Sequence, residues 1–338
     1  MQPNGLKAPL LLALCICILA IAGSTHAAVT MTWLTVGNPG NPNDTADGAI
    51  DTPGVQNFGM VTTTYRIAAH EVTNAQYTEF LNNVDPNGTN PNGIYHTPMG
   101  ITPEILFSAG NAPGTKYWVN ATMENRAVQY VNWFDAARFA NWMHNGQVPG
   151  STETGAYNMT IATPVRLAGA TVFLPTEDEW YKAAYFDPVN PTADEMGSPD
   201  YWSYPTMHDS RPIGAFVSAT GVITNPGPNV VNYDDRRVFE FSLSTVGSAS
   251  ATSYYGAFDM AGNVWEWNEA INSTSLERGI RGGSYGSGYR SLSQSSSEER
   301  DPTFHGRGTG FRLASIPEPP TGSLMLISLV TLASRRRR

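Results

Sequence analysis

Three short helix signals stand far apart in the chain, and the long stretches between them limit the possible folds more than any other feature. Each signal is a capping sequence, in which a Thr or Asn is followed three residues later by a side chain that can hydrogen-bond back to it. The three pairs are Thr73 and Gln76, Asn132 and Asp135, and Thr176 and Glu179. The 32 glycines and 24 prolines place much of the remaining backbone in turns and irregular loops. A bundle of long helices is therefore excluded, and the pattern predicts a single loop-rich α+β domain.

The regular elements expected from the sequence are few and short. Apolar residues recur at helical spacing after each capping sequence, whereas the stretch over 186–232 is interrupted by Pro, Gly and Asn and shows no periodicity. The expected elements are a strand over 65–67, helices over 74–82, 132–146 and following 176, and a closing strand over 310–313.

The charge balance narrows the possible partners. Only 14% of residues are charged and 41% are hydrophobic, which argues against disorder. The formal net charge is −9, so the chain lacks the basic surface on which nucleic-acid binding mostly rests. We expect no nucleic-acid partner.

Residues 1–28 are expected to be a secretory signal peptide. Lys7 precedes an apolar run over 8–22, and small residues follow up to Ala28. The run is shorter than the roughly 20 apolar residues of a membrane-spanning helix, which disfavours an uncleaved anchor. Both cysteines, Cys15 and Cys17, lie in this segment. Cleavage would leave a mature chain without a thiol nucleophile, a disulfide or a thiolate metal ligand.

Residues 316–338 have the layout of a sorting tail. Pro317-Glu318-Pro319 is followed by an apolar run over 323–333 and by four arginines, Arg335 to Arg338. This arrangement resembles the PEP-CTERM signal of Gram-negative bacteria. The resemblance implies an exosortase-type partner, transient membrane anchoring and delivery to the cell surface or extracellular matrix. Residues 29–315 then form the exported domain.

The segment over 259–268 alternates aromatic residues with short oxygen-bearing side chains. Carboxylates and a turn at Gly262 are what a hard-cation loop requires. Taken alone this signal is weak, because Trp265 and Trp267 are equally typical of a hydrophobic core.

Six motifs occur in an order that resembles the formylglycine-generating enzyme family, also called the sulfatase-modifying factor family. They are Glu71-Val72-Thr73-Asn74-Ala75-Gln76-Tyr77, Val131-Asn132-Trp133-Phe134-Asp135-Ala136, Leu174-Pro175-Thr176-Glu177-Asp178-Glu179-Trp180, Asp259-Met260-Ala261-Gly262-Asn263-Val264-Trp265-Glu266-Trp267, Arg281-Gly282-Gly283-Ser284-Tyr285 and Gly310-Phe311-Arg312. The resemblance implies one compact α+β domain related to C-type lectins, poor in regular secondary structure.

The same resemblance implies a structural calcium ion. Its ligands would be the side chains of Asp259 and Glu266 and the carbonyl groups of Gly262 and Val264, all suitable for a hard cation. A second family calcium site would begin near Asn232, but the sequence after Tyr233 departs from the family pattern.

The family's copper chemistry is not expected here. The family binds copper through two cysteines shortly after the Gly-Gly-Ser motif, and soft thiolates suit Cu(I) in a way that hydroxyls do not. Ser287 occupies the place of the first cysteine, and the loop between Tyr285 and Tyr289 is too short to hold the second. No catalytic residue and no copper are therefore expected.

Two interpretations of the arginines near the Gly-Gly-Ser motif remain open. Arg281, Arg290 and Arg312 can line a pocket with Ser284 and Ser287 that accepts an anionic group. Alternatively, these arginines tie the glycine-rich loops together through carbonyl groups. The histidines lack the spacing of a metal site.

Two functions follow. The first is a non-catalytic, calcium-stabilised, exported module that binds a glycan or a surface protein. Aromatic residues at Trp202-Ser203-Tyr204, Tyr254-Tyr255 and Trp265 would supply contacts. The second is a family enzyme, of the formylglycine-generating oxidase type or related to it, with altered metal chemistry.

Overall fold

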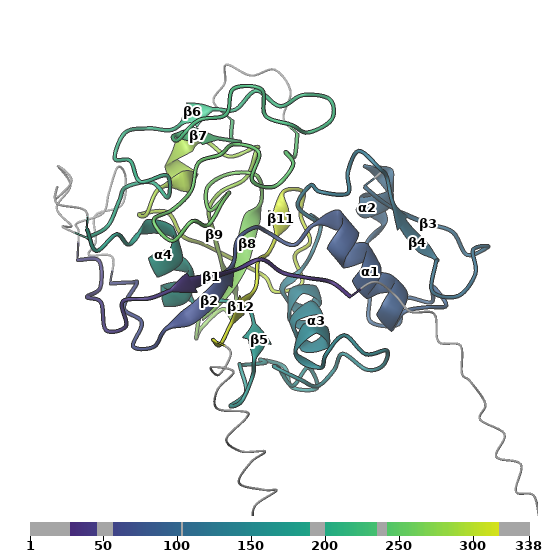
Figure 1. The fold of residues 1–338 in the computed structure, drawn as a ribbon. Helices are drawn as coiled ribbons and strands as arrows, with labels where there is room; N and C mark the ends of the chain where they lie inside the picture. The colour runs from purple at the N-terminus through teal and green to yellow at the C-terminus, as the bar shows by residue number, and fades with distance from the viewer. Residues whose placement is uncertain (1–27, 46–56, 103, 190–199, 235–241, 318–338) are drawn as a thin grey trace, which may run out of the picture.

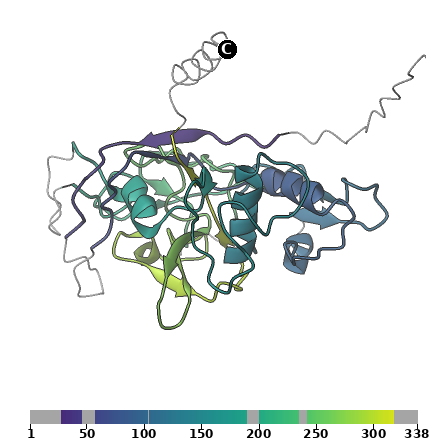
Figure 2. The same ribbon diagram turned by 90° about the horizontal axis from the view of Figure 1, so that it is seen from below.

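The computed structural model describes residues 28–45, 57–102, 104–189, 200–234 and 242–317, and two four-stranded sheets organise them, the first antiparallel and the second mixed (Figures 1 and 2). The first sheet has the order β1-β2-β12-β5 and the second has the order β10-β9-β8-β11. The strands of the first are β1 (Trp33–Val36), β2 (Tyr65–Ala68), β12 (Ala314–Ser315) and β5 (Val172–Phe173). Those of the second are β10 (Glu298–Arg300), β9 (Arg278–Arg281), β8 (Trp265–Ile271) and β11 (Thr309–Gly310). Two further pairs are β3 (Ile105–Phe107) with β4 (Tyr117–Val119), and β6 (Ile213–Gly214) with β7 (Val230–Val231).

The three predicted helices are confirmed, each with its reciprocal capping hydrogen bonds. They are α1 (Asn74–Val84), α3 (Trp133–His144) and α4 (Glu177–Tyr185). In α4, for example, Thr176 Oγ1 accepts from the Glu179 amide at 3.0 Å, and Glu179 Oε2 accepts from the Thr176 amide at 2.7 Å. The short helices α2 (Thr97–Ile101) and η1 (Tyr289–Leu292) carry no strong signal in the sequence.

Aromatic side chains fill the space between the helices and the sheets. Phe139 of α3 lies 5.2 Å from Phe80 of α1 and 5.4 Å from Phe311, measured between ring centroids. Trp133 and Trp267 are fully buried in the same cluster. Burial of these large apolar surfaces is the main stabilising contribution to the fold.

The closing segment differs from the single strand expected over 310–313. Thr309 and Gly310 pair in parallel with β8, whereas Ala314 and Ser315 lie between β2 and β5 in the other sheet. The chain passes from one sheet to the other at Phe311–Leu313, and within this crossing Arg312 pairs with the buried Glu266 of β8. One expected strand is therefore two.

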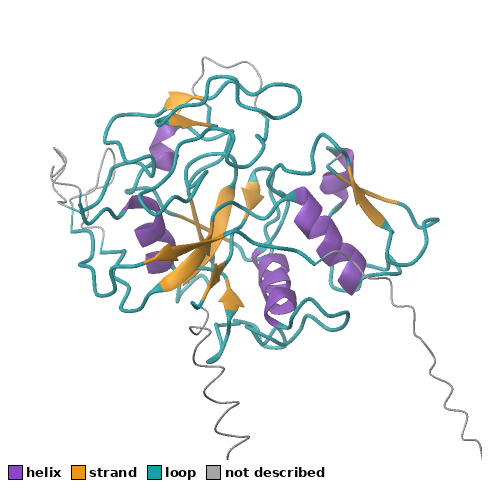
Figure 3. Cartoon of the chain, viewed as in Figure 1, coloured by secondary structure: helices purple, strands orange, loops and turns teal. Residues whose placement is uncertain are grey.

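Loops make up most of the described chain (Figure 3), and the expected loop-rich α+β domain is confirmed. Within the described ranges, no helix has the length and apolar character needed to cross a membrane. The signal peptide predicted over 1–28 and the sorting tail predicted over 316–338 lie almost entirely outside those ranges.

Candidate functional site

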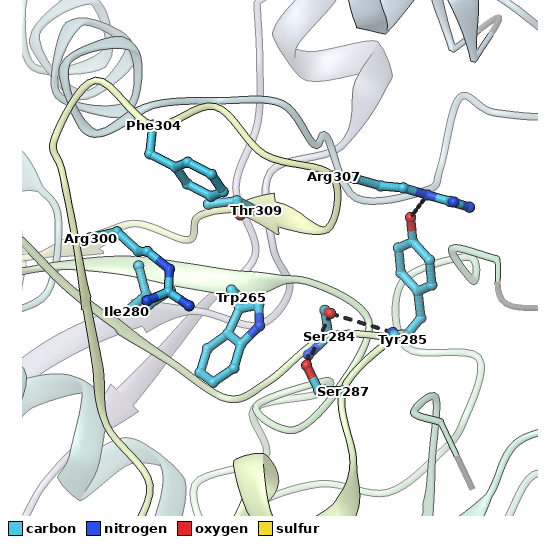
Figure 4. A pocket seen from close by; sticks show the side chains of 10 residues that line it. Trp265, Ile280, Ser284, Tyr285, Ser287, Arg300, Phe304, Arg307 and Thr309 are labelled. Carbon is cyan, nitrogen blue, oxygen red and sulfur yellow. Dashed lines mark hydrogen bonds between the residues drawn. The ribbon is translucent and has the colours of Figure 1, made fainter. Parts of the chain in front are cut away.

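An open pocket of about 420 Å³ lies where the second sheet meets two loops, over 283–288 and 301–308 (Figure 4). Phe304 stands on one side of it and Trp265 on the other. The polar side chains that line it are Ser284, Tyr285, Ser287, Arg300, Arg307 and Thr309. Its volume lies within the range of roughly 300–1,000 Å³ that is usual for small-molecule sites.

The two serines predicted at the site are brought together in this pocket. Their hydroxyl oxygens are 3.2 Å apart, and Ser287 Oγ accepts a hydrogen bond from the Ser284 amide at 3.0 Å. Gly308 has φ +73°, and a Cβ atom there would lie only 3.1 Å from the Ser284 side chain. Glycine at 308 thus allows the second loop to pack tightly against the serines.

A chain of hydrogen bonds connects Arg307 to a buried carboxyl group. Arg307 Nε donates to Tyr285 Oη at 2.6 Å, and Tyr285 Oη donates to Gln129 Oε1 at 3.2 Å. Gln129 Nε2 then donates to Glu104 Oε1 at 2.5 Å. Each donor in this series of hydrogen bonds has one acceptor, so the series holds the Arg307 side chain in one orientation.

Glu104 is buried, and its second carboxyl oxygen has no hydrogen-bond partner among the described residues. Burial raises the pKa of this carboxyl to about 7, against smaller lowering effects of hydrogen bonds from Gln129 and Thr102 and of the charges of Arg126 and Arg307.

The outer side of the loop over 301–308 is fixed by a histidine stack. The rings of His96 and His305 lie 3.9 Å apart between centroids, at an interplanar angle of 12°. His96 Nε2 lies 2.8 Å from Oδ2 of the buried Asp135, which also caps α3. The pocket wall is thereby anchored to a helix N-terminus.

Arg281 does not line the pocket. Its side chain is fully buried, and Nη1 donates to the carbonyl groups of Gln294 and Ser296 at 2.9 and 2.8 Å. Its Nε donates to Glu177. The alternative role, in which arginine ties loops together, is the one that the structure supports for this residue.

Arg312 is also outside the pocket, in a buried ion pair with Glu266. Arg312 Nε and Nη2 donate to the two carboxylate oxygens of Glu266, each at 2.6 Å, and Trp180 Nε1 donates to Oε2 at 2.7 Å. Arg290, the third predicted arginine, lies on η1 with an exposed side chain, 5.7 Å from the ring centroid of Tyr289. Arg300 and Arg307 are instead the arginines that line the pocket.

The segment over 259–266 forms a tight buried turn. Asp259 and Asn263 have φ values of +53° and +55°, and Asn263 Nδ2 donates to Glu71 Oε1 at 3.0 Å. Asp259 Oδ2 accepts from the Gly247 amide. Burial and the nearby Glu266 raise the pKa of Asp259 to about 6, while burial and the charge of Asp259 raise the pKa of Glu71.

The expected calcium ligands fit this turn only in part. Both oxygens of Glu266 are engaged by Arg312 and Trp180, so this side chain is already neutralised by a cation. Asp259 and the carbonyl groups of Gly262 and Val264 remain from the expected set. Within the described residues, no group of three or more His, Cys, Asp or Glu side chains is placed to hold a metal. At the second expected site, Asn232 donates to Ser242 and Ser244, and residues 235–241 lie outside the described ranges.

The aromatic residues proposed as contacts have different environments. Ser203 and Tyr204 are buried, and Trp202 Nε1 donates to Asp187 at 3.0 Å. Tyr254 is 38% exposed but does not line the pocket, whereas Trp265 does. Of these residues, only Trp265 lines the pocket, and it does so with a small part of its surface, because the residue is 8% exposed and packs in the hydrophobic core.

The sequence did not predict five residues of the pocket and of the hydrogen bonds behind it, namely Glu104, Gln129, Arg300, Phe304 and Arg307. The one local signal was the pair of glycines at 306 and 308 beside Arg307, since a loop with two glycines often packs closely against a neighbour. No spacing connects Glu104 or Gln129 to the pocket.

Comparison with known proteins identifies the family. Residues 40–316 match the model of the Sulfatase-modifying factor enzyme 1-like domain. The chain belongs to this family. The family assignment made from the six motifs is thereby confirmed, and Ser284 and Ser287 lie in the sulfatase-modifying factor domain.

Individual relatives of this sulfatase-modifying factor protein are distant. It is 26% identical over 215 residues to "Hercynine oxygenase" of Mycolicibacterium smegmatis, and the match covers 61% of this chain but only 37% of that protein. The solved structure of "Treponema denticola variable protein 1" is 19% identical, with a TM-score of 0.51 over 87% of this chain and 98% of that one. The structure of "CarF" is 21% identical, with a TM-score of 0.48 over 86% and 99% of the two chains. At 19% identity, the likeness to the "Treponema denticola variable protein 1" structure shows the fold alone.

Proposed function

We propose that this sulfatase-modifying factor protein is a non-catalytic, exported binding module whose ligand, a glycan or a surface protein, occupies the pocket beside Trp265. The observation that carries the proposal is the pair of hydroxyl groups of Ser284 and Ser287. Ser287 lies where the family resemblance places the first copper-binding cysteine, Ser284 matches the serine of the Gly-Gly-Ser motif, and the chain has no cysteine after Cys17. Hydroxyl groups of ordinary acidity do not replace thiolates as ligands of Cu(I).

The competing function is a family enzyme with altered metal chemistry. The distant relationship to a protein named as an oxygenase supports this alternative, although the match spans little more than a third of that relative. The two functions predict different metal contents and different reactivity toward oxygen.

The test combines metal analysis with an oxygen electrode. The purified protein is expected to contain no stoichiometric copper or iron and to consume no oxygen in the presence of a cysteine-containing peptide. Stoichiometric copper with peptide-dependent oxygen consumption would refute the binding-module proposal in favour of the enzyme.

Calcium binding is part of the proposal, with Asp259 and the carbonyl groups of Gly262 and Val264 as ligands. Removal of calcium with a chelator is expected to lower the melting temperature, because an ion bound only to the folded state stabilises it by mass action. The variant Asp259→Gly removes the carboxylate and tolerates the positive φ at this position. Its melting temperature should not respond to chelator, and a wild-type protein that also fails to respond would contradict calcium binding.

Export and surface sorting complete the proposal. A leader over 1–28 would direct secretion, and a tail over 316–338 would be recognised by an exosortase-type partner. The protein should appear in the surface or matrix fraction of its host. Removal of residues 317–338 should shift it to the soluble exported fraction, and an unchanged distribution would contradict a sorting role for the tail.

A further inference from the structure

We propose that the pocket recognises an acidic sugar residue, one that carries a carboxylate or a sulfate, and that Arg307 is the group that binds its charge. This inference rests on the proposed binding function and assigns a ligand class to the same site. Three observations carry it. Arg307 has no carboxylate partner among the described residues, its side chain is held in one orientation, and aromatic side chains line the pocket.

Several other arginines of this acidic protein are paired with carboxylates inside the fold. Arg138 pairs with Glu153 and Arg166 with Glu179, each at 2.7 Å, and Arg312 pairs with Glu266 at 2.6 Å. Arg307 differs from them, because its side chain is exposed and makes no ion pair with any described residue. A positive charge without a carboxylate partner at a pocket wall is available to an anionic ligand.

The guanidinium group of Arg307 is also held in place before a ligand arrives. Its Nε is occupied by Tyr285 Oη, which is tied through Gln129 to Glu104. The two Nη atoms keep their hydrogens for a ligand, and two parallel donors match the oxygens of a carboxylate or a sulfate. A side chain that is already oriented loses less conformational entropy on binding.

Arg300 lines the opposite end of the pocket and can supply a second contact. It pairs with Glu298 of the same strand, but both side chains are partly exposed, at 45% and 32%. Exposed ion pairs of this kind contribute little free energy, so a ligand anion can compete with Glu298 for the guanidinium group.

The apolar walls favour a sugar ring over a bare anion. Phe304 is 42% exposed, although the ring is large and apolar, and it faces the pocket opposite Trp265 (Figure 4). Gly306 permits this position, because a Cβ atom at 306 would lie 2.2 Å from the Phe304 ring. A sugar ring presents an apolar C–H face that can cover such aromatic surface, and its hydroxyl groups can bond to Ser284 and Ser287.

The experiment measures binding to the purified protein by titration calorimetry with four probes. Trigalacturonate carries carboxylates, a chondroitin sulfate tetrasaccharide carries both carboxylates and sulfates, chitotetraose is neutral, and triglutamate is an acidic peptide. We expect both acidic sugars, or the sulfated one alone, to bind at least about tenfold more tightly than chitotetraose and triglutamate. Binding of only the sulfated probe identifies sulfate as the recognised group.

Variants connect this selectivity to the named residues. Arg307→Gln should weaken binding of the acidic sugars about tenfold or more and leave chitotetraose binding unchanged, and Arg307→Lys should recover part of the loss. Tyr285→Phe keeps the charge but removes the group that orients it, so the ratio of acidic to neutral binding should fall. Arg211→Gln is the matched control, because it removes one exposed positive charge outside the pocket.

Three outcomes would overturn the inference. These are equal binding of chitotetraose or triglutamate, no binding of either acidic sugar at millimolar concentration, and an Arg307→Gln variant that behaves like Arg211→Gln. Tight binding of the neutral sugar or of the peptide would still leave the proposed binding function in place. Copper-dependent oxygen consumption would instead remove the proposed function itself.

Discussion

Replacing Glu104 with glutamine should make the protein more stable at alkaline pH. The Glu104 carboxyl is 4% exposed, and one of its oxygens has no hydrogen-bond partner among the described residues. Ionising such a group costs free energy that an amide does not incur. Glutamine has nearly the same shape, and its Oε1 can still accept the hydrogen bond from Gln129 Nε2.

The magnitude follows from the pKa of this carboxyl, which burial raises from 4.5 to about 7. Between these two pH values the unfolded chain releases the proton while the folded protein retains it, so the free energy of unfolding falls as pH rises. One pKa unit corresponds to about 1.4 kcal/mol, and the full loss above pH 7 is therefore about 3 kcal/mol. Below pH 4.5 the group contributes no such loss.

The assay is urea unfolding of the wild-type protein and of Glu104→Gln at several pH values from 4 to 8. The two proteins should have similar stability at the acidic end, and the variant should exceed the wild type by about 3 kcal/mol at pH 8. A matched control is Glu124→Gln, at an exposed glutamate, where the change should stay within about 0.5 kcal/mol at every pH. A stability difference that does not vary with pH, or a less stable Glu104→Gln protein at pH 8, would refute the reasoning.

Three further variants test other parts of the structure by urea unfolding. Arg312→Met leaves the buried Glu266 carboxylate without its cationic partner and should lower the free energy of unfolding by about 3–5 kcal/mol. A loss no larger than that of a typical surface substitution would show that the ion pair contributes little to stability. Gly262→Ala should be far more damaging than Gly40→Ala: both glycines have positive φ, but the new Cβ would meet a carbonyl oxygen at 2.2 Å at 262 and nothing within 4 Å at 40. Equal effects at the two positions would contradict the close approach. Thr176→Ala removes the cap of α4 and should cost about 1 kcal/mol, whereas an unchanged midpoint would mean that the capping hydrogen bond is dispensable.

The helices could be predicted because their signals are local. Thr176 and Glu179 are three residues apart, and their reciprocal hydrogen bonds depend only on the first turn of the helix. The order of motifs likewise sufficed for the family and for the loop-rich fold. Ser284 and Ser287 lie close together for the same reason, since one short turn holds both.

The arginines could not be assigned in this way, because their partners are distant in sequence. Arg281 and Arg312 stand beside the Gly-Gly-Ser and Gly-Phe motifs, but their carboxylate partners are 104 and 46 residues away. Which arginine is neutralised and which stays available depends on those long-range pairs. Arg307 was overlooked because its partner Tyr285 connects it to Glu104, which no motif includes.

The position of β12 has a consequence for the timing of folding. This strand, Ala314–Ser315, lies inside the first sheet and joins β2 to β5, and Arg312 just before it neutralises Glu266. A growing chain that has not yet reached residue 315 therefore has an open sheet and an unpaired buried carboxylate. The domain cannot complete its first sheet before β12 has been synthesised, so it should fold after synthesis rather than during it. Its folding should also be slow, because many contacts join residues that are distant in sequence. Under the export proposed above, such a delay would keep the chain unfolded during its passage across a membrane.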